Sequence, residues 1–315
     1  MLIASPEKKG LLVVAVATVW QAGGAVFLAE SSGPESSSRI AFLAFALAGS
    51  VSWLPLPGAR ERDQAPAGSR EAGPVGPRAC LVVVTAGAFL AFYAALARVP
   101  VEAASALEVA AGLVTVLAVS ARRTGVAAAS LWRTLAALGV VLVCALVTGA
   151  VLGRDGHVEA DPGGVAAGIG LAVTAGACGG VVVLVSSASG ARGASAAQLA
   201  RERFSGAAII AAVVVLVTGA GVGVPAITWG GEGIIAALSI SGPILLLQWG
   251  LMHAEPVGSE LLLASLPALV HAGDSVWTQR WDPLLGGLMG LLVLTVVAAQ
   301  LGPRARTVGR GGGVS

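Results

Sequence analysis

The sequence contains few charged residues, and this shortage excludes an ordinary soluble domain. Charged side chains make up 11% of the 315 residues, whereas soluble globular domains carry roughly a quarter. Hydrophobic residues make up 56% of the chain, so we predict a membrane protein whose surroundings are the lipid bilayer. The net charge is only +2 and the basic residues are scattered, which gives no indication of a nucleic-acid partner.

Cysteine is scarce as well, and the common catalytic motifs are absent. The three cysteines, Cys80, Cys144 and Cys178, lie far apart in apolar runs and show neither C-x-x-C nor His–Cys spacing. We expect them to be buried free thiols. The sequence has no Walker loop, dinucleotide-binding motif, zinc motif or nucleophile elbow. We therefore expect a protein that is not an enzyme and that uses no cofactor, no metal ion and no ATP-hydrolysing domain.

What the chain has in abundance is long apolar runs, and ten of them are long enough to cross a bilayer as helices. They lie at residues 11–29, 39–56, 79–97, 101–121, 132–152, 163–187, 204–222, 233–252, 257–277 and 283–301. Only helices and closed barrels satisfy their backbone groups in lipid. The sequence therefore predicts an all-α polytopic membrane protein with ten transmembrane helices, the first of which is too long to be a cleaved signal peptide.

The basic residues predict which side of the membrane each loop faces. If the N-terminus is cytoplasmic, 15 of the 19 basic residues fall on the cytoplasmic side. Those on the other side are Arg39, Arg98, Arg154 and Arg280. We expect a multi-pass protein of the cytoplasmic membrane with both termini, including the tail 304–315, in the cytoplasm. The long loop 58–78 is rich in Pro, Gly, Arg and Glu and is expected to be a flexible cytoplasmic linker.

The two halves of the chain resemble each other. Pro100–Val101 and Pro256–Val257 each precede an apolar run, and they are separated by 156 residues, about half the chain. Five spans in each half is an odd number, so the halves would enter the bilayer from opposite sides. Inverted repeats of this kind are typical of secondary transporters. We predict a first five-helix repeat over residues 1–155 and a second over residues 156–303.

Several stretches resemble the EamA-type members of the drug/metabolite transporter superfamily, over nearly the full length of the chain. The stretch Val19–Gly24 is similar to the tryptophan–glycine start of the family repeat, and Leu266-Pro267 to the leucine–proline of its ninth span. Asp282-Pro283-Leu284, followed by several glycines, is similar to its short acidic turn and final helix. The first half departs from this pattern, with Ala111-Gly112 where the family has a proline.

The resemblance implies two inverted five-helix repeats around a cavity lined by the third, fourth, eighth and ninth spans. It also implies secondary transport of a small solute, often export of a metabolite, an amino acid or a drug-like compound. Protons are a candidate coupling ion because Glu108, His271 and Asp274 lie within predicted spans. The alternative is a non-transporting integral membrane scaffold or accessory subunit. In that case the polar residues of the spans would pack against one another and leave no cavity.

Glu108 is the first candidate for a functional residue within a span. It lies about seven residues into the fourth run, roughly 10 Å below the membrane surface at 1.5 Å per residue, where a carboxylate is too costly to face lipid. Ser105 and Thr115 share its side of the helix. We expect Glu108 to accept a proton or to bind a cationic solute, with Thr115 on the same polar stripe. The alternative is a protonated Glu108 that serves packing alone.

The ninth run predicts a second set of polar residues. Glu260, Pro267, His271 and Asp274 recur at helical spacing, so a continuous helix would place them on one face. Glu260 is then expected near the cytoplasmic entrance and Asp274 near the outer exit. Pro267 is expected to kink the helix or to free a carbonyl for a solute. His271 and Asp274 are expected either to relay protons or simply to reach the outer interface.

Two amides and one tyrosine complete the predicted site. Gln21 in the first run and Gln248 in the eighth each bring two donors and one acceptor into an apolar helix. Each amide is expected either to bind the solute or to join neighbouring helices. Tyr93, near the end of the third run, is expected to line the cavity, although aromatic residues at helix ends also serve as interfacial anchors.

Overall fold

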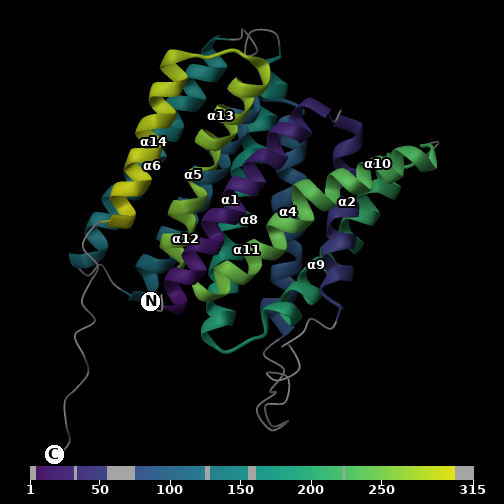
Figure 1. Cartoon of the computed structure of the whole chain (residues 1–315), viewed down its shortest axis with the longest axis horizontal. Coiled ribbons are helices and arrows are strands. Elements are labelled where there is room, and N and C mark those ends of the chain that lie inside the picture. The colour runs from purple at the N-terminus through teal and green to yellow at the C-terminus, as the bar shows by residue number, and fades with distance from the viewer. Residues whose placement is uncertain are drawn as a thin grey trace, which may run out of the picture.

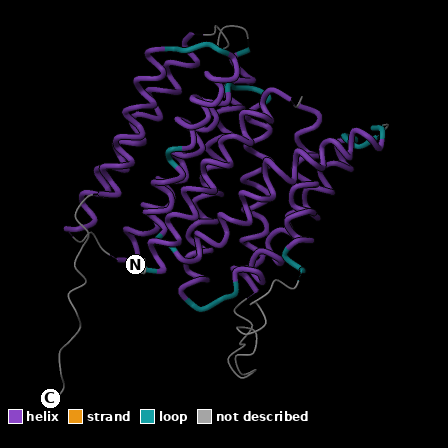
Figure 2. Tube along the Cα trace, in the orientation of Figure 1, coloured by secondary structure: helices purple, strands orange, loops and turns teal. Residues whose placement is uncertain are grey.

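A computed structural model describes residues 5–31, 34–54, 75–124, 128–154, 161–222 and 224–301. Within these residues the chain consists of helices joined by short turns, without strands (Figure 2). The predicted all-α class is therefore confirmed. Most of the predicted linker 58–78 and the whole of the tail 304–315 lie outside the described residues, and residues 75–78 of that linker belong to a helix.

The helices follow one another along the chain (Figure 1). They are α1 (Pro6–Ser31), α2 (Pro34–Val51), α4 (Val75–Leu96), α5 (Val101–Thr124), α6 (Ala128–Arg154), α8 (Pro162–Ala191), α9 (Ala196–Thr218), α10 (Ala226–Ala236), the π-helix η2 (Ala237–Ser241), α11 (Gly242–His253), α12 (Pro256–Leu263), α13 (Leu266–Thr278) and α14 (Pro283–Leu301). The segments α10, η2 and α11 are continuous, whereas α12 and α13 are separated by a turn.

Seven stretches of the described chain are long and apolar enough to cross a membrane. They are Pro6–Leu28, Arg78–Leu96, Val101–Arg122, Leu131–Gly153, Pro162–Ala191, Ala226–His253 and Pro283–Leu301. Large apolar side chains such as Leu142 and Leu294 are exposed on their outer faces, which suits lipid far better than water. The chain therefore has the architecture of a multi-pass helical membrane protein.

The other three predicted runs are also helical, but they differ from simple spans. The apolar part of α2 is short, from Ser38 to Val51. Helix α9 carries three charged residues, Arg201 to Arg203, near its start. The ninth run is divided between α12 and α13. A total of ten membrane crossings therefore stays a prediction.

The helices run back and forth between two ends of the bundle (Figure 1). We call the end where α1 begins the N-terminal end. There a Cβ atom on Gly10 would lie 2.8 Å from the backbone carbon of His253, at the end of α11. At the opposite end, a Cβ on Gly168 of α8 would lie 2.8 Å from the side chain of Val99, just before α5. The beginning of α1 and the end of α14 lie at the same end, as an even number of crossings requires.

Glycine brings the backbones of α5 and α8 into direct contact. A Cβ on Gly176 of α8 would lie 1.9 Å from the carbonyl oxygen of Glu108, and a Cβ on Gly180 would lie 2.6 Å from that of Gly112. Only a residue without a side chain allows so close an approach. This crossing fixes the position of Glu108 inside the bundle.

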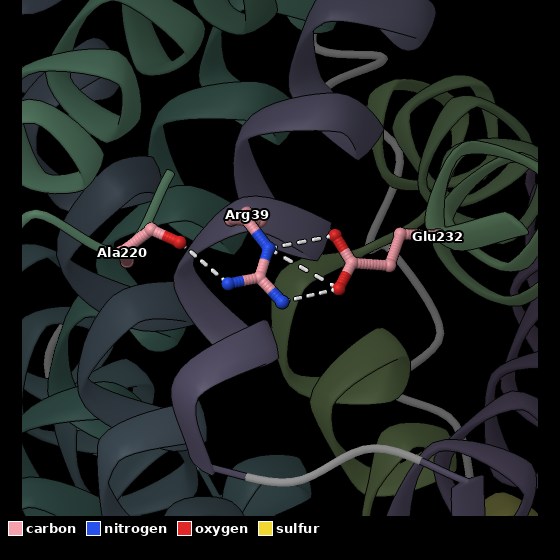
Figure 3. A network of polar contacts seen from close by, with 3 residues as sticks. All are labelled: Arg39, Ala220 and Glu232. Carbon is pink, nitrogen blue, oxygen red and sulfur yellow. Dashed lines mark hydrogen bonds and ion pairs between the residues drawn. The ribbon is translucent and has the colours of Figure 1, made fainter. Parts of the chain in front are cut away.

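A buried ion pair joins α2 to α10 at the opposite end (Figure 3). The Nε of Arg39 donates to Glu232 Oε2 at 2.8 Å, and its Nη2 donates to Oε1 at 2.5 Å. Its Nη1 donates at 2.5 Å to the carbonyl of Ala220, in the turn after α9. The sequence placed Arg39 among the basic residues of the outer loops. Instead, both charged side chains are buried, and Arg39 links α2 to two segments that lie 181 and 193 residues away in the sequence.

Two further expectations are corrected by the fold. The ninth run was predicted to be one helix in which Pro267 causes a kink or frees a carbonyl for a solute. Instead, α12 ends at Leu263 and Pro267 lies in the first turn of α13, where a missing N–H costs little. The three cysteines are free, as expected, but only Cys144 is buried: Cys80 is exposed and Cys178 is partly exposed.

Candidate substrate cavity

A cavity of about 120 Å³ lies inside the bundle. Residues from α1, α4, α5, α8, α9, α11, α12 and α13 line it, together with the π-helix η2. Apolar side chains make up most of its wall, including Phe89, Phe92 and Leu96 of α4. Its polar members are Gln21, Tyr93, Ser105, Glu108, Arg203, Ser239 and Glu260. Pockets of this kind, largely apolar with a few polar groups, are typical of small-molecule sites.

Two carboxylates face this cavity from different helices. Glu108 lies two turns into α5 and is half-buried because its side chain borders the open space. Glu260, one turn into α12, is buried, and its Oε2 has no hydrogen-bond partner among the described residues. A Cβ on Gly112 would lie 2.2 Å from Glu260 Oε1, so the Glu260 side chain lies against the backbone of α5. Glu108 and Glu260 therefore lie on the wall of the same cavity, and their common function stays a prediction.

Arg203 is the cavity residue that the sequence analysis missed. It was assigned to the cytoplasmic loop before the seventh run, yet α9 begins at Ala196 and Arg203 is 4% exposed. Its Nε donates to Thr85 Oγ1 at 2.7 Å, and its Nη1 donates to Gln248 Oε1. Its guanidinium carbon also lies 4.8 Å from the ring centre of Phe204. A buried guanidinium is costly unless its donors are satisfied, and these contacts satisfy part of them.

The two predicted amides take different places. Gln21 lines the cavity, and its Oε1 is buried with no hydrogen-bond partner among the described residues. Gln248 is 1% exposed and lies behind the wall, where its Oε1 accepts from Arg203 and, at 3.5 Å, from Ser186. Gln21 therefore borders the cavity, whereas Gln248 lies behind Arg203 and joins α8, α9 and α11.

Tyr93 lines the cavity as expected, in an aromatic wall on α4. Its ring centre lies 6.0 Å from that of Phe92 and 6.4 Å from that of Phe89. Rings at these separations attract one another. They give the cavity a flat apolar face that suits a hydrocarbon or aromatic group of a solute.

Besides Gln248, four of the predicted site residues lie away from this cavity lining. Thr115 faces α8, where a Cβ on Gly180 would lie 2.9 Å from it. Pro267 is buried in α13. His271 is buried with its Nδ1 3.8 Å from Glu102 Oε1 and its ring centre 5.7 Å from that of Trp281. Asp274 is partly buried one turn further along α13. The turn between α12 and α13 separates the three α13 residues from Glu260.

The π-helix η2 contributes backbone as well as Ser239 to the region of the cavity. Trp20 of α1 donates its indole N–H to the carbonyl of Leu238 at 2.8 Å. Ser241 donates to the carbonyl of Ala44 in α2 at 2.9 Å. A π-helical turn often marks a functional site, and here it attaches the eighth predicted span to both α1 and α2.

The described residues contain no group of three or more His, Cys, Asp or Glu side chains that could bind a metal ion. The polar groups of the cavity are instead two carboxylates, one guanidinium, one amide, one phenol and two hydroxyls. These groups can bind ammonium, carboxylate and hydroxyl groups through charge and hydrogen bonds.

Comparisons with known proteins identify a shared fold. No protein-family model matches the chain, and no curated protein matches it. Among solved structures, 14 chains match. One of them, described only as a crystal structure of a protein, is 15% identical to this chain and has a TM-score of 0.66. The alignment covers 94% of this chain and 97% of the other. The chain therefore shares its fold, over nearly its whole length, with a protein of known structure.

Proposed function

We propose that this protein is a secondary transporter that carries a small, partly apolar solute with a cationic or hydrogen-bond-donating group across the cytoplasmic membrane. The observation that carries the proposal is the cavity inside an apolar helical bundle, with Glu108 and Glu260 on its wall. Intramembrane carboxylates are expensive and typically mark solute or proton pathways. A scaffold needs no such cavity, so the cavity favours a transporter over the alternative of an accessory subunit.

The pattern of helix contacts supports an inverted-repeat architecture. Helices α4 and α5 both pack against α8 in the way that α11 and the α12–α13 pair pack against α1. Helix α2 packs against α9, and α6 packs against α14. Exchanging the two halves of the chain converts the first set of contacts into the second and leaves the last two pairs unchanged. These contacts are the ones expected of two five-helix repeats of opposite orientation. In such an architecture each repeat can rock against the other around a central site.

The cavity lies closer to one end of the bundle, as one state of an alternating-access carrier would require. Helices α8 and α11 meet tightly at the N-terminal end, where a Cβ on Gly190 would lie 2.0 Å from the carbonyl oxygen of Met252. The lining residues of α4, from Ala88 to Leu96, belong to the half of that helix towards the opposite end. With the predicted orientation, the N-terminal end is cytoplasmic and the cavity lies towards the outside.

The test is counterflow in proteoliposomes, with labelled leucine and labelled leucinamide as probes. Both probes have a branched apolar body and an amino group that ionises to ammonium. We expect Glu108→Gln and Glu260→Gln each to lower the counterflow rate of leucinamide about tenfold or more, because each removes a charged partner of the ammonium group. Glu202→Gln is the matched control, since Glu202 pairs with Arg78 near the surface of the bundle, and it should leave the rate within about twofold.

Two outcomes contradict the proposal. Wild-type protein that gives no counterflow of either probe above empty liposomes would count against transport of this class of solute. Equal counterflow rates in wild-type protein and in both cavity variants would show that neither carboxylate takes part in solute binding. The same liposomes test proton coupling: uptake that ignores both Glu108→Gln and an imposed pH gradient would show that protons are not coupled through Glu108.

A further inference from the structure

The cavity contains one positive charge, and the structure leaves that charge without a counter-ion. Arg203 has no carboxylate within ion-pair distance among the described residues, although Glu108 and Glu260 line the same cavity. Its two side-chain hydrogen bonds go to uncharged groups, the hydroxyl of Thr85 and the amide of Gln248. A desolvated charge of this kind is normally paired, so the missing partner calls for an explanation.

Thr85 and Gln248 fix the guanidinium in one orientation. Thr85 is fully buried, and its hydroxyl donates a hydrogen bond to the carbonyl of Leu81 at 2.7 Å. Its oxygen can therefore accept a hydrogen bond from Arg203 Nε. Gln248 is fully buried in α11 and accepts from Nη1. Helices α4, α9 and α11 each contribute one of these three side chains, so the guanidinium is preorganised before any ligand arrives.

One nitrogen of Arg203 remains available. Nη2 has no hydrogen-bond partner among the described residues, yet it is not one of the fully buried polar atoms that lack a partner. Nη2 therefore keeps some accessible surface, and Arg203 is one of the residues that line the cavity. A guanidinium with an edge open to a cavity is a strong donor for a carboxylate, which it binds through charge-assisted hydrogen bonds.

We propose that Arg203, oriented by Thr85 and Gln248, binds a carboxylate of the solute and so decides between zwitterionic and purely cationic solutes. The inference rests on the proposed transport function and adds a second recognition point to it. A solute with a carboxylate and an ammonium group places the first on Arg203 and the second near Glu108 and Glu260. The apolar body of that solute packs on the aromatic wall of α4.

The test compares three probes that share one carbon skeleton. Leucine carries both charges, leucinamide only the positive charge, and isocaproate only the negative one. Binding is measured on the purified full-length protein by the ligand-dependent rise of the thermal unfolding midpoint. In wild-type protein we expect leucine to bind about tenfold or more tightly than leucinamide, since a hydrogen bond to a charged group contributes roughly 1.5–3 kcal/mol.

Arg203→Met removes the charge and keeps the length of the side chain. It should weaken leucine binding about tenfold or more and change leucinamide binding by less than about twofold. Arg203→Lys keeps a positive charge but loses the planar fork, so leucine binding should fall severalfold; it carries the test if Arg203→Met does not fold. The matched control is Arg201→Met, because Arg201 stacks on Trp53 near the surface, 4.1 Å from the ring centre, and should change neither affinity.

The outcomes separate this inference from the transport proposal. Leucine and leucinamide affinities that change by the same factor in both Arg203 variants would overturn the carboxylate site, while leucinamide binding and counterflow would leave the transport proposal standing. Equal binding of leucine and leucinamide by wild-type protein would also overturn it. Failure of all three probes to bind would overturn both proposals.

Discussion

Replacing Arg39 with methionine should lower the free energy of unfolding by about 3–5 kcal/mol, the usual cost of removing one partner from a buried ion pair. The variant leaves the Glu232 carboxylate buried without its cation and also removes the donor to the Ala220 carbonyl. The large effect is expected because Arg39 and Glu232 join α2, α10 and the turn after α9, and because lipid offers neither group a replacement partner. The measurement is the unfolding of purified protein in detergent.

The double variant Arg39→Met, Glu232→Leu separates the ion pair from simple packing. Removing both charges leaves no uncompensated group, so much of the lost stability should return. Arg98→Met is the matched control at the same end of the bundle, since Arg98 is exposed in the turn after α4 and donates to the carbonyl of Ala94 in that helix. A single variant as stable as wild type, or a double variant no better than the single one, would show that the ion pair does not anchor α10.

Replacing Gly176 with alanine should destabilise the protein by about 3 kcal/mol or more, at the upper end of the range for overpacked cores. The added Cβ would lie 1.9 Å from the carbonyl oxygen of Glu108 and 2.7 Å from its carbonyl carbon. Both atoms belong to the backbone of α5, so a rotamer change cannot relieve the clash and the two helices must separate. Because Glu108 faces the cavity from this crossing, the site should be displaced as well.

Gly170→Ala is the control for this prediction. Gly170 lies in the same helix with nothing within 4 Å of an added Cβ, so alanine should be neutral or should stabilise by roughly 0.5–1 kcal/mol through helix propensity. Thermal unfolding of both variants tests the comparison. Equal stability of the two variants would mean that α5 and α8 do not approach as closely as described.

The apolar runs predicted the helices well, because the cost of unpaired backbone in lipid leaves few alternatives. The ends of helices were less predictable. Charged residues next to an apolar run were assigned to loops, so Arg203 was placed outside a helix that in fact begins at Ala196. A signal was available in the sequence: Arg203, Ala207 and Ala211 recur every four residues and all three are buried, which is the spacing of one helix face.

Arg39 could not be recognised as a buried ion pair for a different reason. Its partner Glu232 is 193 residues away in the sequence, and charge counts distinguish only the two sides of a membrane. The basic-residue bias is a statement about loops. Such a count does not detect a charged side chain that pairs with an opposite charge inside the bundle.

Part of the candidate site followed from residue type alone, and part did not. Glu108, Gln21, Tyr93 and Glu260, which the sequence analysis named as candidates, line the cavity, and their part in solute binding stays a prediction. The remaining residues of the ninth run were placed by assuming one continuous helix. The turn at Ala264 and Ser265 interrupts the helical spacing, so His271 lies against Glu102 instead of facing the cavity.

We propose that the cavity between the helices is a water-accessible solute site, and thiol labelling measures this accessibility. In a variant whose three native cysteines are replaced by alanine, Gly179→Cys places a thiol on the cavity wall, and Thr174→Cys places one on the exposed outer face of the same helix. We predict that a water-soluble maleimide labels the protein with Gly179→Cys, that saturating leucinamide protects this thiol, and that Thr174→Cys remains unlabelled in lipid. A Gly179→Cys thiol that is unreactive, or equally reactive with and without leucinamide, would contradict the claim.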